Sequence, residues 1–145
     1  MTEVRPARDA DEVRAALALR HEVFVVEQNV PSEEEIDEHD DGALHLVAVE
    51  DARVVATCRI VLDDGTAKLG RVAVAASARR RGLASRLLDE SERHAGALGA
   101  RRIALAAQTD ALPLYERAGY TPYGERFLDA GIEHLMMEKT LAARA

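Results

Sequence analysis

The stretch from Gly70 to Ala84 reads GRVAVAASARRRGLA and is the most informative part of this 145-residue chain. It begins as a short apolar strand and ends by opening a helix, in which Leu83, Leu87 and Leu88 start an apolar stripe at helical spacing. A basic loop that runs from Arg79 to Gly82 joins the two. The stretch therefore predicts a strand, a short loop and a helix in direct succession.

The start of that helix has the features of a phosphate site. The first N–H groups of a helix lack intrahelical partners, and together with the helix dipole they attract anions. Gly82 lets a phosphate approach the backbone, and arginines add charge-assisted hydrogen bonds. Positive charge at a helix N-terminus is unfavourable without an anion, which favours this prediction over a solvated helix start. The predicted phosphate-binding residues are Arg79, Arg80, Arg81, Gly82, Leu83 and Ala84.

Two better-known phosphate motifs do not fit this stretch. A P-loop requires a Gly-Lys-Ser/Thr ending, and a dinucleotide fingerprint requires three glycines where this loop has only Gly82.

The rest of the chain predicts one mixed α/β domain over residues 1–145, with the order β-α-βββ-α-β-α-ββ. Asp9 is the expected N-cap of the first helix, with Glu12 in the capping-box position, and this helix should fray over residues 23–28. The acidic stretch 31–42 is expected to be a loop with at most one helical turn. The expected strands are residues 4–7, 43–49, 54–62, 67–74, 102–107, 120–127 and 132–141, and the later helices begin at Gly82 and span 111–118.

Composition excludes several classes of protein. The net charge of −7 and an aromatic content of 3% disfavour a nucleic-acid-binding domain. The single cysteine, Cys58, cannot form an internal disulfide, and no Cys or His spacing suggests a metal. No segment approaches the ~20 apolar residues of a membrane span, and the N-terminus does not look like a signal peptide. We expect a cytoplasmic protein without a metal, a membrane contact or a nucleic-acid partner.

Two ordered motifs resemble the GNAT superfamily of acetyl-CoA-dependent N-acetyltransferases. The first is Arg-x-x-Gly-x-Ala at residues 79–84, between a strand and an amphipathic helix, and the second is LYERAGY at residues 114–120. Three further stretches, RHEVFVVEQNV at 20–30, EIDEHD at 35–40 and GIEHLMME at 131–138, are similar to the ElaA-like branch. The resemblance covers nearly the whole chain.

The resemblance implies direct transfer of an acetyl group from acetyl-CoA, as cosubstrate, to a primary amine of a small molecule or peptide. It implies that the backbone of Val72, Ala73 and Val74 binds the pantetheine arm, and that the Val74 N–H polarises the thioester carbonyl. Gln108 stands where the superfamily often has Asn, and Arg79 where it often has Gln. Both substitutions keep a hydrogen-bond donor, so Gln108 is counted with the cofactor-binding residues.

Tyr115 is the candidate general acid for the CoA thiolate. The reference pKa of a tyrosine, ~10, exceeds that of a thiol, ~8.5, so Tyr115 is expected to act mainly as a hydrogen-bond donor. The alternative is a helix tyrosine that only packs on the core.

The general base that would take a proton from the acceptor amine is less clearly indicated by the sequence. A carboxylate near the acceptor can relay such a proton. Glu27 ranks first because it follows an apolar run, and most acidic residues of such loops are simply solvated. The remaining candidates are Glu35, Asp37, Asp40 and His134.

Three further expectations concern partners and alternatives. The acidic segment 33–41 suggests a cationic acceptor such as a polyamine, an aminoglycoside or a peptide amine. Exposed strands near the C-terminus suggest pairing of two protomers as a homodimer. The alternative function is a non-catalytic acyl-CoA-binding regulatory module, which would keep the phosphate loop and lack a productive acceptor site.

Overall fold

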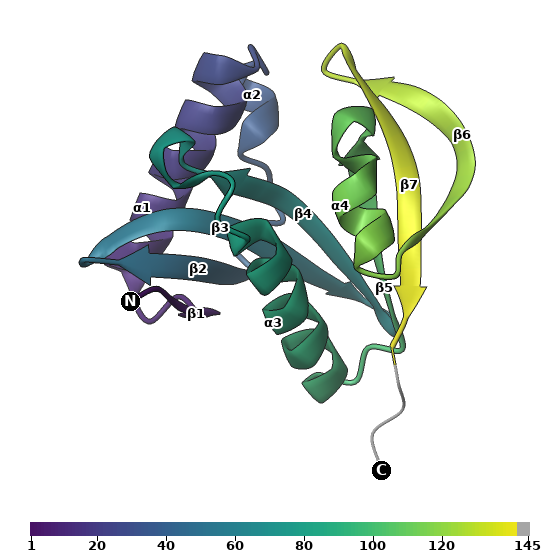
Figure 1. Ribbon diagram of the computed structural model, residues 1–145, viewed down its shortest axis with the longest axis horizontal. Coiled ribbons are helices and arrows are strands. Elements are labelled where there is room, and N and C mark those ends of the chain that lie inside the picture. Colours follow the sequence, from purple (N-terminus) through teal and green to yellow (C-terminus); the bar gives the residue numbers. More distant parts are fainter. Residues whose placement is uncertain (142–145) are drawn as a thin grey trace.

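One seven-stranded mixed sheet dominates the computed structural model, which describes residues 1–141 (Figure 1). The strand order across the sheet is β1-β2-β3-β4-β5-β7-β6. The strands are β1 Glu3–Pro6, β2 Leu44–Glu50, β3 Arg53–Asp63, β4 Thr66–Val74, β5 Arg102–Gln108, β6 Thr121–Asp129 and β7 Ile132–Thr140. The α-helices are α1 Ala10–Arg20, α2 Ser32–Glu35, α3 Leu83–Ala97 and α4 Leu112–Arg117. The mixed α/β fold predicted from the sequence is confirmed.

The strands form two antiparallel groups joined by one parallel pair. Strands β1 to β4 are antiparallel neighbours, and β5, β7 and β6 form the second antiparallel group. Strands β4 and β5 pair in parallel, because α3 carries the chain between them.

Helices α1 and α3 pack on opposite faces of the sheet. Neighbouring residues of a strand point to opposite faces. On β3 the Cys58 thiol lies 3.3 Å from the Ser91 hydroxyl of α3, while the next residue, Arg59, contacts Asp40 on the α1 side. The α3 face holds most of the apolar core, in which Leu46, Ile60 and Leu87 are almost fully buried. Each such side chain contributes about 1.5–3 kcal/mol.

The first helix starts as predicted and ends differently. The Asp9 carboxylate accepts a hydrogen bond from the Glu12 N–H at 2.9 Å, which confirms the N-cap. The helix does not fray, because it continues as a π-helix, His21–Glu27, that keeps Val23 buried. The Val30 N–H then bonds to the Phe24 carbonyl at 2.9 Å and closes this segment.

Across residues 1–141 no helix is both long enough and apolar enough to cross a membrane.

Candidate functional site

Strands β4 and β5 separate halfway along the sheet, and this split creates the site. Their parallel pairing ends at Leu69 and Leu105. Just beyond, the register between β3 and β4 shifts, and Arg71 adopts a positive φ of 55°. This bulge bends β4 away from β5, and Figure 1 shows the two strands diverging toward α1 and α4. Within residues 1–141, the edge of β4 after Leu69 has no strand paired on the side that faced β5.

A cavity of about 630 Å³ lies in this split. Five predicted site residues line it, namely Val72, Gln108 and Tyr115 and the candidate bases Glu35 and His134. Ala73, Val74, Glu27 and the basic loop 79–84 are not among its lining residues. Sequence reasoning missed several other lining residues. These are Phe24, Gln28, Val30, Arg59, Arg71 and Ile132.

Tyr115 is buried at the cavity, with 6% of its surface exposed. Burial raises the pKa of its hydroxyl to about 12. Its ring packs edge-on against Tyr120, with centroids 6.1 Å apart. Its hydroxyl has no hydrogen-bond partner in the described part of the chain. With so high a pKa, the hydroxyl is a better hydrogen-bond donor than proton donor.

Gln108 at the end of β5 reaches across the split. Its side-chain amide donates a 2.8 Å hydrogen bond to the Gln28 side-chain oxygen, just after the π-helix. Both residues line the cavity. The bond therefore links the end of β5 to the segment that follows the π-helix.

The basic loop forms an uncapped helix start. Gly82 has a φ of 76°, α3 has no side-chain N-cap, and a Cβ placed on Gly82 would meet no atom within 4 Å. The N-terminal N–H groups of this 15-residue helix are thus open to a ligand. Within residues 1–141, Arg80 takes part in no ion pair, and it has a φ of 63°.

The other two loop arginines form ion pairs. The sequence had suggested that the positive charges of this loop have no acidic partners. Arg79 donates to both Glu27 carboxylate oxygens, at 2.7 and 3.0 Å, and to the Val74 carbonyl at 3.0 Å. Arg81 pairs with Glu50. All these contacts lie at the surface, and Arg79 keeps the pKa of the Glu27 carboxyl below its usual value. This ion pair weakens the case for Glu27 as a base.

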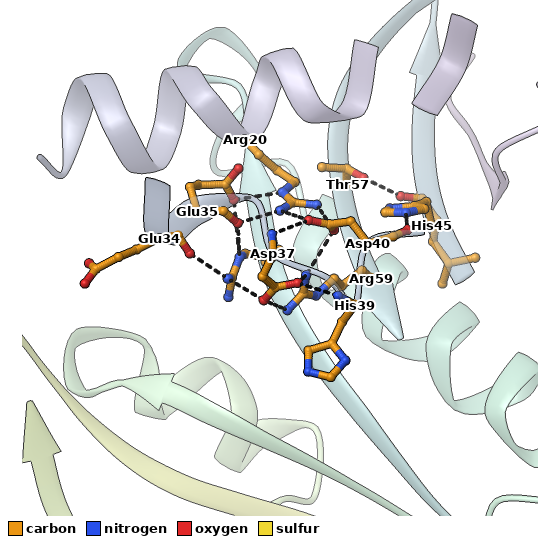
Figure 2. A network of polar contacts seen from close by, with 11 residues as sticks. Arg20, Glu34, Glu35, Asp37, His39, Asp40, His45, Thr57 and Arg59 are labelled. Carbon is orange, nitrogen blue, oxygen red and sulfur yellow. Dashed lines mark hydrogen bonds and ion pairs between the residues drawn. The ribbon is translucent and has the colours of Figure 1, made fainter. Parts of the chain in front are cut away.

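Three carboxylates of the acidic segment 33–41, those of Glu35, Asp37 and Asp40, belong to an ion network that is largely buried, while the other acidic side chains of the segment are exposed. Figure 2 shows Arg20 of α1 pointing toward Glu35 and Asp40. Its guanidinium bonds to the Glu35 carboxylate at 2.8 Å and to the Asp40 carboxylate at 2.7 Å. The side chains of Arg20, Glu35 and Asp40 are 1%, 3% and 8% exposed. Arg20 lies one turn after buried Ala16, and that spacing was the signal that its side chain faces inward.

Two further arginines complete the network from the sheet. Arg59 of β3 bonds to both Asp37 oxygens, at 2.7 and 2.9 Å, and to Asp40 at 3.0 Å. Arg71 of β4 donates to the Glu35 carbonyl at 3.0 Å and contacts Asp37 at 3.3 Å. Three guanidiniums thus neutralise three carboxylates, and none of these carboxylates is free to act as a base.

His134 on β7 is buried at the cavity, with 9% of its surface exposed. Its ring stacks on Phe127 of β6, with centroids 5.7 Å apart and planes 23° apart. It is the register partner of Gln108 on β5. Among residues 1–141, no cluster of three or more His, Cys, Asp or Glu side chains could hold a metal ion.

Known proteins match this chain over nearly its whole length. Residues 6–141 match the family model described as an acetyltransferase (GNAT) domain. The Bacillus subtilis (strain 168) protein "Uncharacterized N-acetyltransferase YjcF" is 41% identical over 134 residues, which cover 92% of this chain and 96% of that protein.

Two solved structures share the fold. An acyl-CoA N-acyltransferase from Pseudomonas aeruginosa has a TM-score of 0.84 at 30% identity, covering 96% of this chain and 99% of that one. Escherichia coli ElaA has a TM-score of 0.83 at 25% identity, covering 96% of this chain and 98% of that one.

Proposed function

Because the chain belongs to the GNAT family of acetyltransferases, we propose that it transfers the acetyl group of acetyl-CoA directly to a primary amine of a small molecule or peptide. The observation that carries this proposal is the split between β4 and β5, which opens a cavity beside Tyr115. A split sheet exposes a backbone edge and a polar side chain in one place, as a two-substrate transfer requires.

The chain has groups that fit coenzyme A at two places. The uncapped start of α3 with Gly82 suits the pyrophosphate, because open N–H groups and the helix dipole favour an anion there. Arg80 is the loop arginine available to it without breaking an ion pair. The unpaired edge of Val72, Ala73 and Val74 suits the amide groups of the pantetheine arm, as an added strand would. The bound cosubstrate supplies an activated thioester.

Two side chains act at the reacting end of the cavity. The Tyr115 hydroxyl donates a hydrogen bond toward the position of the leaving sulfur, which stabilises negative charge without full proton loss from the tyrosine. The Gln108 amide holds Gln28 and so fixes the acceptor-side wall. In the predicted binding role, Gln108 also donates to the pantetheine arm.

The acceptor is proposed to be a cationic amine. Fewer free carboxylates support this proposal than the sequence suggested. The network arginines already neutralise Glu35, Asp37 and Asp40. Glu34 and Asp129 remain at the cavity, and their carboxylates form no ion pair within residues 1–141. These two carboxylates would attract an ammonium group.

Calorimetry and a thiol-release assay test the proposal. We expect acetyl-CoA to bind at micromolar concentrations and CoA thiol to be released with spermidine, kanamycin or a lysine-containing peptide. Tyr115→Phe should retain binding and lose turnover. Absence of binding at millimolar acetyl-CoA rejects the proposal, and binding without acetylation of any amine supports the non-catalytic acyl-CoA-binding module.

The oligomeric state and the cellular location of the protein stay predictions. A homodimer would use the edge strand β6, along which every residue is exposed. Light scattering would decide between monomer and dimer. A cytoplasmic location is likewise a prediction, which fractionation of cells would check.

A further inference from the structure

The ring of His134 is held in one orientation and one tautomer. Its Nδ1 lies 2.7 Å from the Ile132 carbonyl oxygen. A carbonyl oxygen only accepts hydrogen bonds, so Nδ1 carries the proton, and the lone pair of the neutral ring lies on Nε2. Within residues 1–141 Nε2 has no hydrogen-bond partner, yet it is not sealed off as the unpaired Nδ1 of His45 is. His134 therefore offers a proton acceptor at the cavity.

The carboxylates that competed for this role are occupied elsewhere. Glu27 lies outside the cavity lining and is bound to Arg79 through both oxygens. Glu35, Asp37 and Asp40 bond to network arginines. A carboxylate that already accepts several charge-assisted hydrogen bonds is a poor proton acceptor.

We propose that His134 is the catalytic base, which accepts a proton at Nε2 from the acceptor ammonium, directly or through one water. This inference rests on the proposed function and deepens it. An ammonium carries three protons. One passes to His134 and later to solvent, one reaches the leaving sulfur with Tyr115 donating a hydrogen bond there, and one stays on the amide nitrogen. The amine lone pair forms the new C–N bond, and the electrons of the broken C–S bond go to sulfur.

Imidazole suits this proton transfer better than a carboxylate. The reference pKa of an alkylammonium exceeds that of imidazole by about 4 and that of a carboxyl by about 6. The uphill step is thus smaller for an imidazole base than for a carboxylate base. A positioned base typically contributes about 10²–10⁴-fold to the rate.

NMR tests the premise without any need for activity. Two-bond 15N–1H correlation spectra of the whole protein, assigned by loss of one set of ring signals in a His134→Asn variant, report the tautomer of each histidine. We expect the neutral His134 ring to carry its proton on Nδ1. A proton on Nε2 would overturn the proposal, whatever the enzyme acetylates.

Kinetics tests the role itself, with a matched control. His134→Asn keeps a donor for the Ile132 carbonyl and lacks the Nε2 acceptor. His45→Gln is the control, because His45 is also buried and bonded to a carbonyl, that of Asp40 at 2.9 Å, but does not line the cavity. We expect kcat to fall by about 100-fold or more in His134→Asn, with the acetyl-CoA Kd unchanged, and to stay near wild type in His45→Gln.

Chemical rescue separates a base from a structural residue. Added imidazole should restore acetylated amine, measured by mass spectrometry, to His134→Ala, which leaves room for it, and not to His134→Asn. Unchanged kcat in His134→Asn, or equal losses in both His134→Asn and His45→Gln, would overturn the proposal. A wild type that binds acetyl-CoA and acetylates none of the three amines rejects the proposed function and the base role together, and the NMR result still stands as a separate test of the tautomer.

Discussion

The buried network and the basic loop are both dense in charge, yet they are built in opposite ways. Arg20 and Glu35 are 1% and 3% exposed, whereas Arg79 and Glu27 are 41% and 40% exposed. The network charges face each other inside the protein, where each depends on its partners. The loop charges face water, so a ligand can replace their partners at little cost. Charge in the network therefore stabilises one wall of the cavity, which Glu35, Arg59 and Arg71 line, and charge in the loop can exchange its partners.

This difference follows from desolvation. A buried charge that loses its partner keeps the full cost of its removal from water, while an exposed charge is resolvated. Substitutions in the network should therefore act on stability, and substitutions in the loop on ligand binding.

The largest expected effect comes from Arg20→Met. It leaves the carboxylates of Glu35 and Asp40 buried without their main partner, which should cost about 3–5 kcal/mol of unfolding free energy. Urea unfolding measures this loss. Arg79→Met is the matched control, with the same substitution in an exposed pair, and should shift the midpoint far less. Similar losses in both variants would contradict the distinction between the two regions.

The second effect is a dependence of stability on pH that belongs to the network. Burial works against the charged form of Asp40, but hydrogen bonds from Arg20, the Asp37 N–H and Arg59 hold the pKa of its carboxyl well below the usual range. Such a group stabilises the fold above its unfolded pKa of ~3.9, and this contribution is lost as the pH falls toward the folded pKa.

We therefore expect wild type to lose about 2 kcal/mol more than Asp40→Asn does between about pH 6 and about pH 2.5. Urea unfolding across that range makes the measurement. Equal slopes for the two proteins would show that the network carboxylate is not the titrating group.

The difference between the network and the basic loop also shows what the sequence could and could not predict. The alternating and helical spacings of apolar residues predicted nearly every strand and α-helix, because these spacings depend on residues that are close in the sequence. The partners of charged residues did not follow, since Arg20, Arg59 and Arg71 meet the acidic segment only in the folded sheet. The motif at Gly82 was locally determined, and the helix start that it predicted is present. His134 could be listed as a candidate base, but its tautomer required the contact with Ile132.

The third effect separates backbone strain from ligand binding at the helix start. Gly82 and Gly99 flank the two ends of α3 with φ of 76° and 92°, and a Cβ at either would meet no atom within 4 Å. Alanine at either position should therefore cost about 1–2 kcal/mol of stability through φ alone. Only Gly82→Ala should also weaken acetyl-CoA binding, by about tenfold or ~1.4 kcal/mol, because its methyl group would stand between the backbone and the anion.

Calorimetry with acetyl-CoA on both variants makes this comparison. Equal affinities would show that the helix start is not the phosphate site.

The smallest effect is expected for the exposed pair of Glu27 and Arg79. A double-mutant cycle with Glu27→Gln and Arg79→Gln, followed by urea unfolding, should give a coupling close to zero, because both side chains are largely solvated. About 1 M salt should remove what coupling remains, since the screening length is then ~3 Å. The same salt should weaken a cycle on Asp37 and Arg59 much less, because these side chains are only 27% and 9% exposed. If the Glu27 pair instead resisted salt, the loop would be as fixed as the network, and its arginines could not be released to a phosphate.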